Sequence, residues 1–307
     1  MSTAWHKKIK IFNSTFDNPY DRIKISLKTG TSGLTEECGM EQTIQALTIA
    51  GHDSDGSAGM PADLHAFFAD QVYGHGILTA AVAGNSHGIY ASQVMPAEFI
   101  AKQFEVLAAD FQIRAAKTGM LANDEVINVV ADSYDEGKFG PLVVDPVIIT
   151  KHGAMLLEQS AYELFRERII PLATVLTPNF FEAQKLTGKE LATPSEIEAA
   201  AEELQALGAK NVVIKGQHVA GQTTPVKDFV RLADQTTFWL TQPYVPTDRV
   251  NGTGDSFSAI IAAELAKGAT VAAAIRRANK LVHAAIANGL TVGHQYGPIN
   301  HWAAMTE

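Results

Sequence analysis

The tetrapeptide Gly252-Thr253-Gly254-Asp255 combines residue types that could bind and transfer an anionic group. It follows a predicted strand end at Pro243–Pro246 and precedes an apolar helical run, Ser256–Gly268. Glycines let backbone N–H groups converge, and a helix start adds unpaired N–H groups with partial positive charge. Such a pocket suits a phosphoryl group. Asp255 at its edge could then accept a proton from an attacking hydroxyl; the alternative is that Asp255 only caps the helix.

Similar polar residues follow other apolar segments that are predicted to be strands. They are Gly51–Gly59 after Ala46–Ala50, Asp145 after Leu142–Val144, Asn179 and Glu182 after Thr174–Leu176, and Lys215 and Gly216 after Val212–Ile214. In sheets of parallel strands, ligands bind outside the carboxyl ends of the strands. We therefore expect these residues to meet at one edge of a sheet.

Asn179 and Glu182 are three residues apart at a predicted helix start, so both can face one point. Glu182 and Asp145 could hold Mg²⁺, which takes only one or two carboxylates in kinases. Asn179 could contact a phosphate oxygen, and Lys215 could neutralise transferred charge. The alternatives are a capping pair, an Asp-Pro turn and a solvated lysine.

The segment Gly51–Gly59 lacks the spacing of a dinucleotide fingerprint or a P-loop. It could shape a small-molecule pocket together with Asp63, whose alternative role is a solvated carboxylate at a helix start. The histidines show no metal-ligand spacing, and no G-x-S-x-G nucleophile motif occurs.

Strands and helices alternate from residue 46 onward, which predicts a mostly parallel sheet covered by helices on both faces. Ile77–Ala83 is a further predicted strand, and residues 226–245 predict an antiparallel hairpin at a sheet edge. The predicted helices are Asp63–Val72, Ala97–Ala108, Glu125–Ser133, Ala161–Ile169, Ser195–Leu207, Asp255–Lys267 and Val271–Asn288.

The composition bounds the class of protein. The 307 residues are 46% hydrophobic with a formal net charge of −9, which suits one large α/β domain and argues against a nucleic-acid binder. A single cysteine, Cys38, and the lack of a spanning apolar run or signal-peptide pattern predict a cytoplasmic protein without membrane contact. Residues 1–39 are polar and turn-rich, so we expect an extension that is disordered or not native, ahead of one domain at 40–307.

The order of motifs resembles the ribokinase-like superfamily, in particular the branch of hydroxymethylpyrimidine (phosphate) kinases and bacterial pyridoxal kinases. The motifs are Lys117-Thr-Gly-Met120, Val-Asp145-Pro-Val, Thr-Pro-Asn179-x-x-Glu182, Val-Ile-Lys215-Gly and Asn-Gly252-Thr-Gly-Asp255, and the resemblance spans Met40 to about residue 302. It implies a three-layer αβα fold, ATP and Mg²⁺ as cofactors, and phosphorylation of a primary alcohol on a small heteroaromatic ring. Relatives are commonly homodimers.

The resemblance also implies roles for individual residues. Gly252–Gly254 would form the anion hole, and Asp255 would be the base. Asn179, Glu182, Asp145, Lys215 and Gly216 would serve the phosphates and Mg²⁺; Gly51, His52, Asp53, Asp63, Asn85 and Met120 would surround the ring; Asn279, Val282 and His283 would lie near the adenine. A segment after Val147 that includes Lys151–Gly153 would act as a lid.

Two departures from the branch bear on the substrate. Many hydroxymethylpyrimidine kinases carry a carboxylate or amide where this chain has Gly84, before Asn85. Asp255 and Thr150 stand where related pyridoxal kinases have cysteines, so a thiol pair cannot capture an aldehyde. We therefore favour a pyridoxal kinase with an aspartate base. The alternatives are a hydroxymethylpyrimidine or phosphomethylpyrimidine kinase, both activities together, a non-catalytic nucleotide-binding relative, or a nicotinamide-dependent oxidoreductase, which would lack its fingerprint loop.

Overall fold

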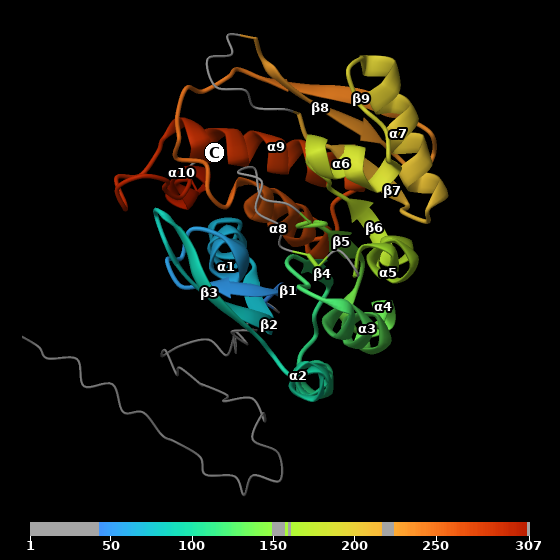
Figure 1. Ribbon diagram of the computed structural model, residues 1–307, viewed down its shortest axis with the longest axis vertical. Helices are drawn as coiled ribbons and strands as arrows, with labels where there is room; N and C mark the ends of the chain where they lie inside the picture. Colours follow the sequence, from blue (N-terminus) through green and yellow to red (C-terminus); the bar gives the residue numbers. More distant parts are fainter. Residues whose placement is uncertain (1–42, 149–156, 159–160, 217–223, 306–307) are drawn as a thin grey trace, which may run out of the picture. The chain divides into compact units, whose positions relative to one another are not determined.

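The computed structural model describes residues 43–148, 157–158, 161–216 and 224–305, which belong to a compact unit, Thr43–Glu307 (Figure 1). Its described strands form one sheet in the order β3-β2-β1-β4-β5-β6-β7-β8-β9. The strands are β1 Gln45–Asp53, β2 Tyr73–Asn85, β3 Gly88–Val94, β4 Ala115–Thr118, β5 Leu142–Val144, β6 Ala173–Leu176, β7 Asn211–Ile214, β8 Val226–Arg231 and β9 Thr237–Gln242.

In the order of the sheet, the strands β2, β1, β4, β5, β6 and β7 pair in parallel. At the edges, β3 pairs antiparallel with β2, β8 with β7, and β9 with β8. The predicted parallel core and the predicted hairpin at residues 226–245 are confirmed by β1, β2, β5 to β7 and the β8–β9 pair. As a result, the carboxyl ends of β1, β4, β5, β6 and β7 meet at one edge of the sheet.

Helices cover both faces of the sheet, as predicted (Figure 1). They are α1 Gly59–Ala69, α2 Ala97–Asp110, α3 Asp124–Ser133, α4 Glu136–Phe139, α5 Ala161–Arg168, α6 Phe180–Thr187, α7 Pro194–Ala206, α8 Thr253–Ala266, α9 Val271–Ala287 and α10 His301–Ala304, with a 3₁₀ turn at Ile170–Leu172. Helices α2 to α7 share one apolar core with the sheet, and α1, α8 and α9 share the other.

Alternation along the strands divides the two cores. In β5, Leu142 and Val144 belong to the core under α2 to α7, whereas Val143 belongs to the core under α8 and α9. This follows from the two-residue period of a strand, whose successive side chains point to opposite faces. Both faces are apolar, so the central strands read as continuous hydrophobic runs and could be predicted.

The structure differs from the prediction at four places. The strands β3 and β4 were not predicted: β3 is an exposed edge strand, and the four residues of β4 include the charged Lys117. The segment Pro243–Pro246 lies outside any strand because β9 ends at Gln242. Helix α8 begins at Thr253, two residues earlier than predicted, which places Asp255 inside its first turn.

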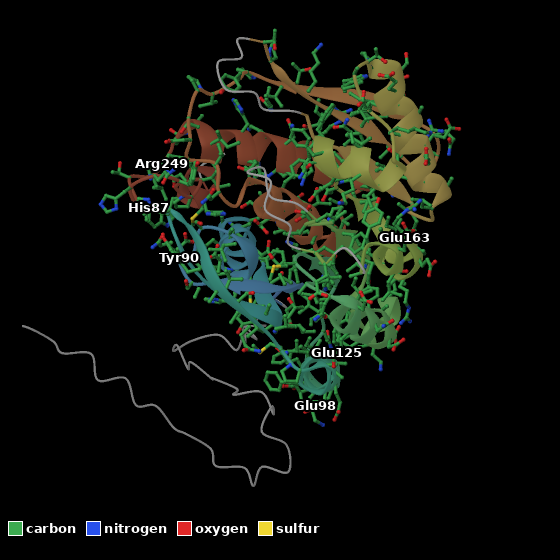
Figure 2. The ribbon with its side chains drawn as sticks, in the orientation of Figure 1. His87, Tyr90, Glu98, Glu125, Glu163 and Arg249 are labelled. Carbon is green, nitrogen blue, oxygen red and sulfur yellow. The ribbon has the colours of Figure 1, made fainter. Side chains whose placement is uncertain are left out.

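Acidic side chains lie on the outer faces of three helices. Figure 2 shows Glu98 on α2, Glu125 on α3 and Glu163 on α5 at the surface, and all three are exposed. Within the described part of the chain, every helix is too short or too polar to cross a bilayer.

Candidate active site

Helix α8 starts at the carboxyl edge of the sheet with Gly252 as its N-cap residue. Gly252 has a φ of 78°, a left-handed conformation that strains residues with a side chain. A Cβ added there would also overlap the carbonyl oxygen of Ser57, in the loop after β1. The glycine is therefore required by conformation and by close packing. It brings the start of α8 against the loop that follows β1.

The next two residues, Thr253 and Gly254, shape the start of the helix in different ways. The Thr253 hydroxyl donates to the carbonyl oxygen of Val250 at 2.7 Å, which closes the turn before α8. A Cβ at Gly254 would lie 3.2 Å from Lys215 Nζ and 3.3 Å from Asp145 Oδ2. The absence of a side chain at Gly254 thus lets the first turn of α8 approach the charged groups at the ends of β5 and β7.

Asp255 is the third residue of α8 and does not cap the helix, because Gly252 occupies the N-cap position. The interpretation of Asp255 as a simple cap is therefore wrong. Its side chain is 18% exposed, and its Oδ1 lies 4.0 Å from Lys117 Nζ. Asp255 is thus a carboxylate at a helix N-terminus, reachable from solvent and facing a buried cation.

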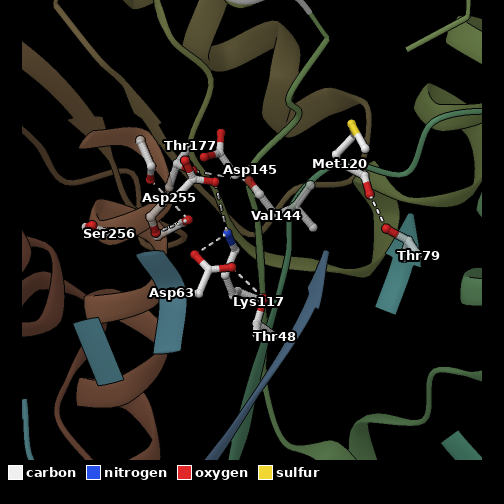
Figure 3. A network of polar contacts seen from close by, with 12 residues as sticks. Thr48, Asp63, Thr79, Lys117, Met120, Val144, Asp145, Thr177, Asp255 and Ser256 are labelled. Carbon is white, nitrogen blue, oxygen red and sulfur yellow. Dashed lines mark hydrogen bonds and ion pairs between the residues drawn. The ribbon is translucent and has the colours of Figure 1, made fainter. Parts of the chain in front are cut away.

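Lys117 comes from β4 and lies between Asp63 and Asp255 (Figure 3). Its Nζ donates to Asp63 Oδ1 at 2.8 Å, and the Thr48 hydroxyl donates to Asp63 Oδ2 at 2.5 Å. The side chains of Lys117 and Asp63 are both fully buried. Burial raises the pKa of Asp63 to about 7, although Lys117 opposes this shift. Burial would lower the pKa of Lys117, but Asp63, Asp255 and Asp145 together raise it.

This geometry bears on the predicted contact between Asp63 and a ring substrate. Both carboxylate oxygens of Asp63 have partners inside the protein, and none of its surface is exposed. The side chain is therefore built to hold Lys117. Direct contact between Asp63 and a substrate stays a prediction, which the buried position of Asp63 does not support.

The ends of β5, β6 and β7 bring together the residues predicted to serve phosphate and Mg²⁺. Lys215 Nζ lies 3.3 Å from Asp145 Oδ1, and Asn179 forms an isolated parallel bridge with Lys215. Asp145 is 4% exposed, so its pairing with Lys215 offsets the cost of burying a carboxylate. These residues border Gly254, which joins them to the start of α8.

Glu182 and Asn179 form a capping box at the start of α6, as the alternative interpretation of this pair held. Asn179 Oδ1 accepts from the Glu182 N–H at 2.9 Å, and Glu182 Oε2 accepts from the Asn179 N–H at 2.8 Å. Glu182 Oε1 accepts from the Ile148 N–H at 3.1 Å. Burial, followed by the nearby Asp145, raises the pKa of Glu182 to about 7.

The carboxylates therefore fit Mg²⁺ unequally. Asp145 Oδ2 faces Gly254, whereas both oxygens of Glu182 already accept backbone N–H groups. In the described part of the chain, no group of three or more His, Cys, Asp or Glu side chains is arranged to hold a metal ion. A site of this kind suits an ion that is bound mainly by phosphate oxygens and water, with Asp145 as its nearest carboxylate.

Asn279, one of the residues predicted to lie near the adenine, joins a second polar network. Asp228 of β8 accepts from the Gly216 N–H at 2.8 Å and from Asn279 Nδ2 at 2.9 Å. Asp228 therefore links the end of β7 to α9. Further along α9, Val282 is buried and His283 is partly exposed.

The loop after β1 and the β2–β3 turn form the other side of the site. A Cβ at Gly51 would lie 2.7 Å from Met120 Cε, so these two predicted substrate residues are neighbours. A Cβ at Gly84 would lie 3.4 Å from Asp53 Oδ1. Burial, then the charge of Asp55, raises the pKa of Asp53 to about 6.

The predicted substrate residues His52 and Asn85 are both exposed. Asn85 Oδ1 accepts from the His87 N–H at 2.9 Å, which orders the β2–β3 turn. Asn85 also lines a cavity of about 430 Å³ between this turn and the loop near Tyr296. Asn85 thus faces an open cavity next to the loop that follows β1.

The sequence predicted no role for three polar residues of the site, namely Thr48, Lys117 and Asp228, although Lys117 begins one of the motifs. The sequence around Lys117 could have indicated a buried lysine, since Lys117 directly follows the apolar pair Ala115-Ala116 and precedes Thr118-Gly119, whereas an exposed turn would have polar neighbours. The predicted lid at Lys151–Gly153 and the position Thr150 lie outside the described residues.

Comparison with known proteins places this site in a family. The phosphomethylpyrimidine kinase family model matches residues 53–300. The chain belongs to this family. It is 44% identical over 265 residues to the hydroxymethylpyrimidine/phosphomethylpyrimidine kinase of Haemophilus influenzae, covering 86% of this chain and 98% of that relative.

Members of the family and its neighbours differ in the ring alcohol that they are named for. The pyridoxine kinase of Bacillus subtilis is 38% identical over 263 residues, covering 84% of this chain and 96% of that relative. The crystal structure of an ADP complex of Bacillus subtilis pyridoxal kinase aligns with a TM-score of 0.78 at 35% identity, covering 86% of this chain and all of that one. The fold is therefore ribokinase-like, and the chain is a phosphotransferase of the vitamin-kinase branch, as the motif series indicated.

Proposed function

We propose that this protein is an ATP-dependent kinase of hydroxymethylpyrimidine and its monophosphate. The observation that carries the kinase assignment is the junction at Gly254, where the start of α8 meets Asp145 and Lys215 and presents Asp255 beside them. Backbone N–H groups, a cation and a general base are the parts that phosphoryl transfer requires.

In the proposed reaction on hydroxymethylpyrimidine, the hydroxymethyl oxygen attacks the γ-phosphorus of ATP in line with the leaving group; on the monophosphate, an oxygen of the substrate phosphate attacks instead. An O–P bond forms, the bond between the γ-phosphorus and the β,γ-bridging oxygen breaks, and ADP leaves. Asp255 accepts the hydroxyl proton, while the N–H groups at the start of α8 and Lys215 stabilise charge on the transferred oxygens. Mg²⁺, when bound near Asp145, would neutralise part of the phosphate charge.

The choice of ring rests on Asp53. Gly84 argued against an aminopyrimidine substrate, because this chain lacks the carboxylate or amide that many hydroxymethylpyrimidine kinases carry at that position, near the end of β2. Asp53 Oδ1 lies 3.4 Å from the position of the missing Cβ, so a carboxylate reaches the same place from β1. A carboxyl group can accept from the exocyclic amine and, when protonated, donate to the adjacent ring nitrogen. This supports the pyrimidine, which is also the ring named for the Haemophilus influenzae relative.

A second candidate is pyridoxal kinase activity, which the sequence favoured and which the Bacillus subtilis relatives are named for. The two rings would share Asp255 as base and differ in the groups that meet Asp53. Pyridoxal has no amine adjacent to a ring nitrogen, so the Asp53 carboxylate would contribute less to its binding.

A panel of ring substrates tests the assignment. ADP formation is measured with hydroxymethylpyrimidine, its monophosphate, pyridoxal, pyridoxine and pyridoxamine. We expect the highest kcat/KM with the pyrimidines; a higher kcat/KM with pyridoxal would replace the first candidate by the second. No ADP formation with any of them would favour a non-catalytic nucleotide-binding protein.

The variant Asp53→Leu tests the ring-reading role, because leucine can neither accept from the amine nor donate to the ring nitrogen. It should lower kcat/KM for hydroxymethylpyrimidine by about tenfold, in the range of one lost hydrogen bond, and change that for pyridoxal far less. Asp248→Leu, at a side chain that is 70% exposed, is the matched control. Equal losses on both rings would contradict the role of Asp53.

We further propose that the protein acts in the cytoplasm as a homodimer and has no nucleic-acid partner. Light scattering after size exclusion tests the dimer, which requires twice the 32.9 kDa of the chain. A mass of one chain at micromolar concentration would contradict it.

A further inference from the structure

Lys117 is a fully buried cation that the proposed mechanism does not use. A buried lysine is costly unless it is paired, and Asp63 alone would satisfy that need. The side chain nevertheless extends between two carboxylates, with Asp63 Oδ1 at 2.8 Å and Asp255 Oδ1 at 4.0 Å (Figure 3). Its position therefore has to be explained with respect to both.

The two carboxylates differ in what surrounds them. Asp63 is fully buried, and Thr48 and Lys117 fix its two oxygens. Asp255 is partly exposed at the start of α8, and its nearest charged partner in the described part of the chain is Lys117. Asp63 thus holds the ammonium group of Lys117 in place on its buried side. On its other side, this ammonium group faces Asp255.

We infer that Lys117 is a positioning residue for Asp255, held in place by Asp63, and that it keeps the carboxylate of the base aimed at the site when an anionic nucleotide enters. This inference rests on the proposed kinase function.

The physical reason is charge balance at the helix start. Asp255 must remain beside a pocket that binds a polyphosphate, so the two negative charges repel each other. Asp53 and Asp145 add further negative charge near Asp255 and Lys117 respectively. Lys215 pairs with Asp145 on the phosphate side, which leaves Lys117 as the cation on the side of the base. A carboxylate without this cation would turn toward solvent.

Three variants separate positioning from simple structural pairing. Lys117→Met should lower kcat by tenfold or more while the KM for ATP changes less than threefold, and it should also reduce stability because Asp63 is left unpaired. The double variant Lys117→Met with Asp63→Asn leaves no unpaired buried charge, so its melting temperature should recover. Its kcat should stay low, because Asp255 still lacks the cation.

Asp63→Asn alone keeps the cation beside Asp255, so it should retain at least tenfold more kcat than Lys117→Met. Lys102→Met removes an exposed lysine that pairs with Glu105 on α2, and it serves as the matched control with unchanged kcat. Recovery of kcat in the double variant would overturn the inference.

A substrate-free measurement keeps the inference separate from the proposed function. In a double-mutant cycle on thermal unfolding, Lys117→Met should lower the melting temperature less in an Asp255→Asn background than in the wild type, because only one carboxylate is then left without its cation. Additive effects would overturn the inference even if the wild type phosphorylates the pyrimidine. Lack of activity in the wild type would contradict the proposed function alone, since the cycle needs no turnover.

Discussion

At the scale of single residues, the carboxylate of Asp255 combines two properties that a capping aspartate lacks. It lies inside the first turn of α8, because Gly252 takes the N-cap position, and it faces Lys117 Nζ at 4.0 Å. Its side chain is 18% exposed, so a substrate hydroxyl can reach it from the solvent side. A carboxylate in this place could accept the proton of that hydroxyl.

Asp255→Asn should lower kcat by about a thousandfold, because an amide cannot accept the hydroxyl proton and general bases contribute roughly 10²- to 10⁴-fold. The near-identical shape should leave the Kd for ATP within about threefold, as measured by equilibrium titration. Asp248→Asn, on the exposed loop before α8, controls for a change in net charge. Turnover within tenfold of wild type would remove Asp255 from the role of base.

The residues at strand ends could be predicted from the sequence, but their partners could not. Asp145 and Lys215 followed obvious apolar strands, and the structure brings them within 3.3 Å. Lys117 was part of a predicted motif, but its role was not predicted, because a buried lysine is recognised only when the carboxylates from α1 and α8 are known to surround it. Glu182 shows the same limit, since its sequence position fits a metal ligand and a capping box equally well.

At the scale of elements, the two ends of α8 provide a matched pair of glycines. Gly252 and Gly268 both have positive φ, at 78° and 88°. Around Gly268 a Cβ would meet nothing within 4 Å, whereas at Gly252 it would overlap the backbone of Ser57. The two positions therefore share the conformational cost of a side chain and differ in packing.

Gly268→Ala should cost about 1 to 2 kcal/mol of unfolding free energy, the cost of a left-handed residue, and leave kcat unchanged. Gly252→Ala should cost about 1 to 3 kcal/mol more, because the loop after β1 must move, and it should lower kcat by displacing the start of α8. Chemical denaturation and steady-state kinetics on both variants give the comparison. Equal effects of the two substitutions would show that α8 tolerates movement at its active-site end.

Helix α10 is joined to α8 by a half-buried histidine. His301 Nε2 lies 2.7 Å from Ser256 Oγ, and the His301 ring is tilted against the ring of His65 of α1, with centroids 5.5 Å apart. Burial, then the charge of His65, lowers the pKa of His301 from 6.5 to about 4. The folded state therefore binds fewer protons than the unfolded state between these two values.

Stability should consequently fall as the pH drops from about 6.5 toward 4, because the unfolded state takes up the proton first. For this group alone the loss between pH 7 and pH 5 is about 2 kcal/mol. His301→Gln keeps a polar partner for Ser256 and should flatten the dependence of the melting temperature on pH in this range. An unchanged pH dependence in the variant would assign the acid sensitivity to other groups.

The central elements could be predicted because burial on both faces leaves long apolar runs, as in β1, β5 and β7. The edge strand β3 escaped prediction since its residues are exposed and show no apolar alternation. The short β4 is recognisable only through its pairing with β1 and β5, which is a property of the sheet and not of its four residues.

At the scale of the whole molecule, the proposed nucleotide site joins elements that are far apart in the sequence. Asp145 follows β5, Asn179 begins α6 after β6, Lys215 follows β7, and Asp228 ties Gly216 to α9. A ligand bound across these ends connects both layers of helices through the sheet edge. Its binding free energy should therefore appear as resistance of the whole unit to unfolding.

ATP with Mg²⁺ at 100 times its Kd should stabilise the wild type by about 2.7 kcal/mol, which raises the melting temperature by about 5 °C or more. Removal of the metal with EDTA should abolish most of this shift, because the triphosphate then meets Asp145 without a neutralising cation. Asp145→Asn should reduce the shift in the presence of Mg²⁺, while Asp248→Asn should not. A full shift in EDTA would show that ATP binds through Lys215 and the start of α8 alone, and Asp145 would then have no part in holding a metal.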